Sequence, residues 1–216
     1  MKIASSNNFK KSLYSSNVSR KNHWVYKYYY KGVVIMKNNE VLINAVLEKS
    51  VSQNWYYAVQ EWRIVDAKED IHCKSACVCG KENIRYLYTL QNTRNGNTLS
   101  PIGSSCIRKF ERQELNEQIL VQEGLFKLIH AITSNQRIEL TSEYFSRKLI
   151  EYMAENDVFK PNAYNNYNGN VDYHFMLNMF NSKTSPTTWQ QSKINIIIAY
   201  EIKPYIKRIS KEKIIY

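Results

Sequence analysis

The chain has 216 residues, of which 30 are Lys or Arg and 19 are Asp or Glu, so its net charge is +11. A hydrophobic content of 44% and a charged content of 23% are typical of a globular protein and exclude a wholly disordered chain. No run approaches the roughly 18 consecutive apolar residues of a membrane span, and the N-terminus lacks the apolar core of a signal peptide. We therefore expect a cytoplasmic protein without a membrane partner.

The first 36 residues divide into two segments of different character. Residues 23–36 are rich in aromatic and β-branched residues, which predicts strands. Residues 1–22 are polar and contain bases but no acid, which predicts a flexible basic arm. The bases of this arm are Lys2, Lys10, Lys11, Arg20 and Lys21.

Helical and extended patterns then alternate. Residues 40–51 place apolar side chains at helical spacing, and residues 55–62 continue with a similar period. Residues 63–68 combine β-branched and charged residues in the manner of a short strand. The sequence therefore predicts two helical segments followed by a strand.

A β-hairpin is predicted next. Apolar and polar side chains alternate over residues 84–91, which indicates a half-buried strand. Asn95 and Gly96 predict the turn, because both residues tolerate positive φ. Residues 99–102 form the returning strand, and Pro101 confines this strand to an edge or an end of the sheet.

Beyond the hairpin the apolar period becomes helical. Ser104 or Ser105 can cap a helix that runs through Cys106. Residues 115–132 carry the apolar stripe of a long amphipathic helix, and Thr141 is placed to cap the next helix. The C-terminal segment is therefore expected to be helical.

The last 56 residues are predicted as a polar loop followed by two helices. Residues 161–170 form an Asn/Tyr-rich loop, and Asp172 begins a short helix. Thr188 and Gln191 have the spacing of a capping box for the final helix, which Pro204 is expected to kink or end.

These elements predict an α+β fold with three parts. The flexible arm of residues 1–22 precedes a β-rich, zinc-binding domain of residues 23–112. An all-α domain of residues 113–216 follows. Because the β-rich part is too small to have a large core of its own, we expect its metal site to stabilise it.

All four cysteines fall within one short segment, as Cys73, Cys77, Cys79 and Cys106. A chain in the reducing cytoplasm is not expected to form disulfides, whereas four thiolates bind zinc tetrahedrally. Gly80 allows the backbone to turn after the Cys-x-Cys pair, and the hairpin then returns the chain to Cys106.

The expected arrangement resembles a treble clef, with a knuckle, a hairpin and a helix start. In it, the helix start lowers the pKa of the Cys106 thiol. We expect a structural zinc ion held by all four cysteines, with His72 as the alternative to Cys73. Free buried thiols or a redox role are the other readings of this cluster.

The segment from Cys77 to Phe110 resembles a motif of uncharacterised zinc-binding proteins from phages and mobile elements of low-GC Gram-positive bacteria. Glu61-Trp62 and residues 173–180 are also similar to such proteins. The resemblance implies a zinc-binding accessory protein in a bacterial host, and by association an anti-defence role of the anti-CRISPR type. The motif residues are Cys77, Cys79, Gly80, Ile84, Tyr86, Asn92, Asn95, Gly96, Gly103, Ser104, Cys106, Ile107, Lys109 and Phe110.

Positive charge gathers around the cysteines, because residues 73–112 hold seven bases and two acids. Such clustering favours a polyanionic partner, and we expect nucleic acid, a nucleoprotein such as a host defence effector, or both. The alternative is an inhibitor that docks on a protein through the helical part. The expected nucleic-acid contacts are Arg85, Arg94, Arg108, Lys109 and Arg112.

Catalytic signals are weak in this sequence. It contains no phosphate-binding loop, no Ser/His/Asp elbow and no His-Glu-x-x-His motif. Asp66-Ala67-Lys68 has the carboxylate–lysine spacing of restriction-type nucleases, and His174 follows an acid at a helix start. We therefore expect a non-enzymatic protein, with a metal-dependent nuclease acting on DNA or RNA as the alternative.

Overall fold

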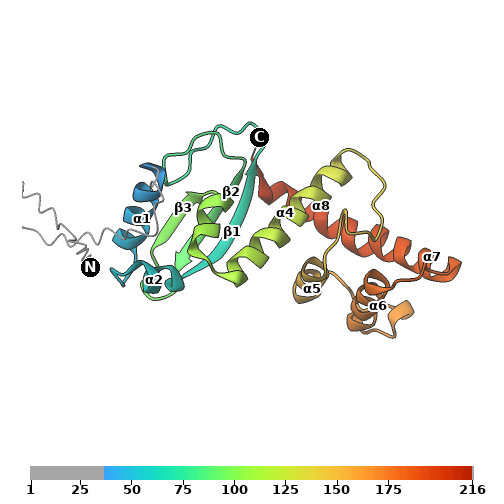
Figure 1. Cartoon of the computed structure of the whole chain (residues 1–216). Helices are drawn as coiled ribbons and strands as arrows, with labels where there is room; N and C mark the ends of the chain where they lie inside the picture. Colours follow the sequence, from blue (N-terminus) through green and yellow to red (C-terminus); the bar gives the residue numbers. More distant parts are fainter. Residues whose placement is uncertain (1–36, 216) are drawn as a thin grey trace, which may run out of the picture. The chain divides into compact units, whose positions relative to one another are not determined.

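The computed structural model describes residues 37–215, and within them the strands form a four-stranded sheet (Figure 1). The predicted basic arm of residues 1–22 and the predicted strands of residues 23–36 lie outside the described residues. The strand order is β3-β2-β1-β4. The strands are β1 Trp62–Asp70, β2 Tyr86–Asn92, β3 Thr98–Ile102 and β4 Ile214–Ile215.

Helices precede, interrupt and follow the strands along the chain. In the described residues, none of these helices is both long and apolar enough to cross a membrane. The helical segments are α1 Lys37–Lys49, α2 Trp55–Ala58, η1 Val59–Glu61, α3 Ser104–Ile107, η2 Arg108–Phe110, α4 Gln113–Thr133, α5 Arg147–Glu155, η3 Ala163–Asn165, α6 Gly169–Asn181, α7 Thr188–Ile197, η4 Ile198–Ile202 and α8 Lys203–Lys213.

The predicted hairpin is confirmed, and its loop is held by a side chain as well as by a glycine. Gly96 has a φ of +77°, which a glycine adopts without strain. The side chain of Asn92 accepts hydrogen bonds from the amides of Arg94 (2.8 Å) and Asn95 (3.2 Å). Among the strands of residues 37–215, β3 is an outer one, which is consistent with the position expected of Pro101.

The end of the chain returns to the sheet. Ile214 and Ile215 pair in parallel with Glu69 and Asp70 of β1. The C-terminal part is helical, as predicted, but the expectation that it is entirely α-helical is wrong because of this short strand. A strand of two residues is too short to show an alternating pattern in the sequence. Its pairing with β1 follows instead from the position of α8, which ends next to the edge of β1.

Both sides of the predicted boundary at residue 113 pack together. α4 and α8 contact β1, and the ring of Tyr86 in β2 stacks on Phe126 of α4 with the ring centroids 5.2 Å apart. Figure 1 shows α4 beside the sheet and α8 leading to the C-terminus. The α+β class is confirmed, whereas the division into domains at residue 113 stays a prediction.

Three predicted helix caps are shifted. Gly103, not a serine, is the N-cap of α3, and it has no side-chain cap. Ser146 rather than Thr141 caps α5, because a turn at Thr141 first buries Phe145. The last capping box uses the neighbouring pair Thr187 and Gln190 instead of Thr188 and Gln191.

The final helix continues through its proline. π-helical turns occupy Ile198–Ile202 immediately before Pro204, and α8 then runs on to Lys213. Because proline lacks an amide hydrogen, it leaves the carbonyl four residues earlier without its usual donor. The wider π turns next to Pro204 accommodate this gap, so Pro204 does not end the helix.

Candidate metal centre

Three of the four cysteines converge in the structure. The Sγ atoms of Cys77, Cys79 and Cys106 all lie within 4.8 Å of one another, and all three side chains are buried. Cys77 and Cys79 lie in the loop between β1 and β2, and Cys106 belongs to α3. Two segments on either side of the hairpin therefore supply the cluster.

The spacing of the thiols fits a shared metal ion. Four sulfur ligands at about 2.3 Å from a tetrahedral zinc ion lie about 3.8 Å from each other. The Sγ atoms of Cys77 and Cys106 are 3.7 Å apart, which is far longer than a disulfide bond of about 2.05 Å. Cys77, Cys79 and Cys106 could therefore hold a metal ion.

Backbone hydrogen bonds position the Cys-x-Cys pair. Gly80 has a φ of +84°, and its amide donates to the carbonyl of Cys77 at 2.8 Å. The amide of Val78 donates to the carbonyl of Pro101 at 2.9 Å. The turn at Gly80 is as predicted, and the bond to Pro101 fastens it to β3.

The pKa values of two thiols in the cluster shift in opposite directions. The hydrogen bond between the Cys77 and Cys106 thiols, together with hydrogen bonds from the amides of Cys79 and Gly103, lowers the pKa of Cys77 to about 5 against the effect of burial. The pKa of Cys106 is raised, chiefly because Cys77 beside it holds the negative charge. The amide of Gly103 at the helix start donates to Cys77, and the expectation that the helix start favours a Cys106 thiolate stays a prediction.

Cys73 lies outside the group of three. It is half-buried with a φ of +51°, and the exposed His72 precedes it. The carboxylate of Asp70 orders their loop by accepting hydrogen bonds from the amides of His72 (3.0 Å), Lys74 (2.9 Å) and Ser75 (2.9 Å). The structure thus brings three expected ligands together, and a fourth ligand, Cys73 or His72, stays a prediction.

Glu61, at the end of η1, is an internal hydrogen-bond acceptor. Its side chain is 1% exposed and accepts from the amides of Val51 and Ser52 (both 2.8 Å) and from the Asn92 side chain (2.7 Å). Burial raises the pKa of Glu61, but these hydrogen bonds and the charge of Arg94 outweigh burial and lower it. Glu61 therefore joins the segment after α1 to the hairpin loop as a carboxylate.

Two further residues, Asn95 and Trp62, strengthen the same junction. The side chain of Asn95 donates to the carbonyl of Lys49 at 3.0 Å. The indole of Trp62, which is fully buried, donates to the hydroxyl of Ser50 at 3.0 Å. These residues hold the hairpin against the end of α1, Trp62 from the core and Asn95 from the surface.

The expected nucleic-acid contacts are engaged by groups of the protein itself. Arg85 pairs with Glu69, Arg94 with Glu61 at 3.8 Å, and Arg108 with Glu123 at 3.5 Å, although all three arginines remain partly exposed. Lys109 donates to the side chain of Asn39. Their positive charges are therefore partly balanced within the protein.

Arg112 is built into the fold more deeply than the other candidates. Its side chain is 12% exposed, and it donates to the carbonyl of Val59 at 3.0 Å and to that of Trp62. Burial lowers the pKa of Arg112. The guanidinium thus connects the start of β1 with the start of α4.

His130 also has a structural partner. Its Nε2 lies 2.8 Å from the carboxylate of Glu69, a fully buried residue that also pairs with Arg85. The sequence offers no local signal for this network, because its members come from α4, β1 and β2.

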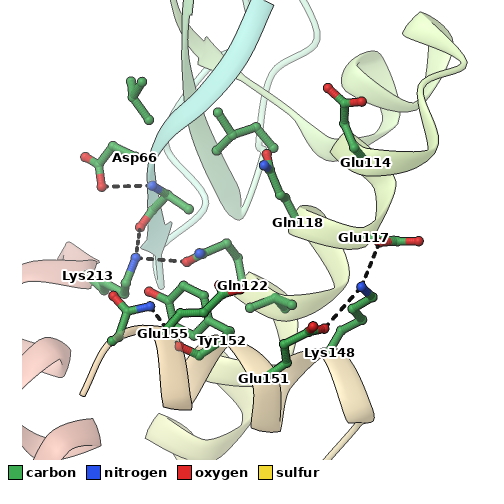
Figure 2. Close-up of a pocket in the computed structure, with 15 residues that line it drawn as sticks. Asp66, Glu114, Glu117, Gln118, Gln122, Lys148, Glu151, Tyr152, Glu155 and Lys213 are labelled. Carbon is green, nitrogen blue, oxygen red and sulfur yellow. Dashed lines mark hydrogen bonds and ion pairs between the residues drawn. The ribbon is translucent and has the colours of Figure 1, made fainter. Parts of the chain in front are cut away.

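A cavity of about 520 Å³ lies between β1 and helices α4, α5 and α8 (Figure 2). Figure 2 shows Asp66 at one wall, and Lys213 donating to the carbonyl of Ala67 (3.1 Å) and to Gln122 (2.9 Å). Asp66 pairs with Lys68 at 3.8 Å, whereas the exposed His174 belongs to α6 and does not line this cavity. The two residues of the nuclease alternative therefore do not share this cavity.

Two acidic residues, Asp172 and Glu201, contact the Asn/Tyr-rich loop of residues 161–170. Asp172 is buried, pairs with Lys193 at 2.8 Å and accepts from the side chain of Asn165 at 2.6 Å. Glu201, in the π-helical turns, accepts from the side chain of Asn162 at 3.3 Å. Burial, together with the nearby Asp172, raises the pKa of Glu201 to about 7.

We expect the Glu201→Gln variant to be less sensitive to pH than the wild-type protein. Between about pH 4.5 and 7 the folded wild-type protein holds one more proton at Glu201 than the unfolded chain, so its stability falls as pH rises. After allowance for solvent screening, the variant should gain about 1–2 kcal/mol relative to wild type between pH 4.5 and 8. Urea unfolding across this range measures the difference. The exposed Glu212→Gln is the control, and parallel stability curves for Glu201→Gln and wild type contradict the prediction.

Comparisons of the chain with protein-family models, with curated proteins and with solved structures found no match.

Proposed function

We propose that this chain is a non-enzymatic, zinc-stabilised protein that binds nucleic acid. The observation that carries the proposal is a cluster of three buried thiols inside a basic segment, since residues 73–112 hold seven bases and two acids. Metal centres of this kind stabilise short segments, and basic side chains on such segments contact phosphates.

Zinc is the metal that the donor set favours. Thiolate ligands with tetrahedral spacing are typical of structural zinc, and Cys73, or else His72, would supply the fourth ligand. A bound ion would link the β1–β2 loop to α3 through Cys77, Cys79 and Cys106. The knuckle, hairpin and helix start are consistent with a treble-clef arrangement, which is part of the proposal.

The biological setting of the proposal comes from the resemblance to phage and mobile-element proteins. We propose a bacterial cytoplasmic location and an anti-defence role, with a nucleoprotein effector as the partner. Affinity purification from a bacterial host, followed by identification of bound protein and nucleic acid, tests this part. Recovery of neither would count against it.

A salt titration tests nucleic-acid binding directly. We expect the wild-type protein to bind fluorescently labelled 30-nucleotide DNA or RNA with an affinity that falls steeply between 50 and 300 mM salt, because phosphate contacts release counterions. Fluorescence anisotropy measures the affinity at each salt concentration. Undetectable binding at 50 mM salt, or binding that salt does not change, contradicts the proposed function.

A further inference from the structure

The run from α7 to α8 has one buried face and one outward face. Its buried side includes Ile194, Ile198, Ile202, Ile206 and Ile209. On the outward side, Trp189 is 66% exposed and Tyr200 is 77% exposed, and farther along the helix the side chains of Lys207, Arg208 and Lys211 are exposed. We call these last five residues the α7–α8 face. Large aromatic rings left in water beside basic residues are typical of a binding surface rather than of a solvated helix.

The basic part of the α7–α8 face differs from the basic segment around the cysteines. Residues 203–213 hold five bases and one acid. Within the described residues, Lys207, Arg208 and Lys211 form no ion pair, whereas Arg85, Arg94 and Arg108 each pair with a glutamate. The charges of the α7–α8 face are therefore more available to an external anion.

Further exposed aromatic rings lie close to this face. Tyr164 and Tyr167 of the Asn/Tyr-rich loop are 92% and 75% exposed. The loop contacts the helix through the hydrogen bond from Asn162 to Glu201, the residue that follows Tyr200. Aromatic rings from two segments that touch are thus presented to solvent, and a row of bases follows farther along the helix.

We propose that the α7–α8 face binds single-stranded nucleic acid, with bases stacked on Trp189 and Tyr200 and phosphates paired with Lys207, Arg208 and Lys211. Unpaired bases stack on exposed aromatic side chains, which a duplex cannot do without opening. A membrane surface fits less well, because the continuous apolar side of this helix is buried in the protein. This inference rests on the proposed nucleic-acid binding and assigns it to a different surface from the one expected from the sequence.

The test compares the binding of labelled single-stranded oligo(dT) of 30 nucleotides by matched variants. The triple variant Lys207→Gln, Arg208→Gln and Lys211→Gln should lose at least about 10-fold in affinity at 150 mM salt and reduce the salt slope by about 2. Tyr200→Ala should weaken single-strand binding about 5- to 100-fold and change duplex binding little. Lys127→Gln, Arg137→Gln and Lys183→Gln remove the same number of charges from other exposed positions and should change affinity less than about 3-fold.

The outcomes separate this inference from the proposed function. If the wild-type protein binds no nucleic acid, the proposed function and this inference both fail. If it binds, but the α7–α8 variants match wild type while Arg94→Gln, Arg108→Gln and Lys109→Gln together abolish binding, the proposed function stands and this inference is overturned. Equal losses for duplex and single strand with Tyr200→Ala would overturn the stacking role. Thermal melting of each variant confirms that it is folded.

Discussion

The Cys106→Ser variant should lose bound metal and about 4 kcal/mol of unfolding free energy. The hydroxyl of serine does not ionise at neutral pH, so the variant lacks one of three converging thiolates. A ligand present at about a thousand times its dissociation constant stabilises the folded state by about 4 kcal/mol, and the variant forgoes this stabilisation. Metal analysis of natively purified protein and urea unfolding measure the two effects.

A chelator separates the loss of metal from the cost of changing a buried side chain. In excess EDTA, wild type and Cys106→Ser should approach the same stability, because neither then holds metal. Ser105→Ala, one residue away in α3 and exposed, is the matched control and should keep its metal. A metal content near zero in the wild-type protein would falsify the prediction.

Cys73→Ser uses the same measurements to test the fourth ligand. If Cys73 completes the site, the variant should retain metal with a weaker affinity in competition with a zinc chelator. An unchanged affinity would show that Cys73 is not a ligand and would favour His72 as the fourth ligand.

The Glu61→Ala variant should lose about 3–5 kcal/mol of stability, although Glu61 lies outside the metal cluster. The substitution leaves the amides of Val51 and Ser52 and the Asn92 side chain without their acceptor in a buried place. Urea unfolding measures the loss, and Glu61→Gln, which keeps one acceptor oxygen, should fall between Ala and wild type.

A surface glutamate provides the control for Glu61. Glu139 is half-exposed and pairs with Arg137, so Glu139→Ala should cost less than about 1 kcal/mol. The lowered pKa of Glu61 adds a pH signature: its stabilising effect is present above the ordinary pKa of 4.5 and is lost as pH falls through the lower folded value. Equal costs for Glu61→Ala and Glu139→Ala would show that the junction contributes little.

The Glu61 junction suggests a physical reason for the spacing of the motif. Glu61, Asn92 and Asn95 form hydrogen bonds that hold the hairpin against the end of α1. Cys106 follows β3, the second strand of this hairpin. If the hairpin shifted, Cys106 would move relative to Cys77 and Cys79. Glu61, Asn92 and Asn95 thus help to position the thiols without contacting them.

Much of the secondary structure was predictable because its signals are local. Alternation over residues 84–91, the Asn95-Gly96 turn and the apolar stripe of residues 115–132 each involve neighbours in the chain. The cap of the last helix was displaced by one residue because Thr187 and Thr188 have the same chemistry, so either can serve and packing selects one.

The partners of charged side chains were not predictable from local patterns. Arg112 resembled an exposed contact next to the cysteines, yet it donates to carbonyls of Val59 and Trp62 about fifty positions earlier. In the sequence, Glu201 is a single acid among apolar residues. Its pKa is raised because the fold buries it near Asp172. Burial and pairing depend on which distant segments meet, and periodicity does not contain that information.

The sequence by itself determined the α+β class, the hairpin and a cluster of cysteines within a basic segment, because turn chemistry, periodicity and spacing are written locally. Only the tertiary structure decided that Cys77, Cys79 and Cys106 converge while Cys73 lies outside the group, and that β4 pairs with β1. Within residues 37–215 it also decided which basic residues form ion pairs and which do not. These features rest on contacts between residues far apart in the chain, such as Lys213 with the carbonyl of Ala67, and packing alone brings such residues together.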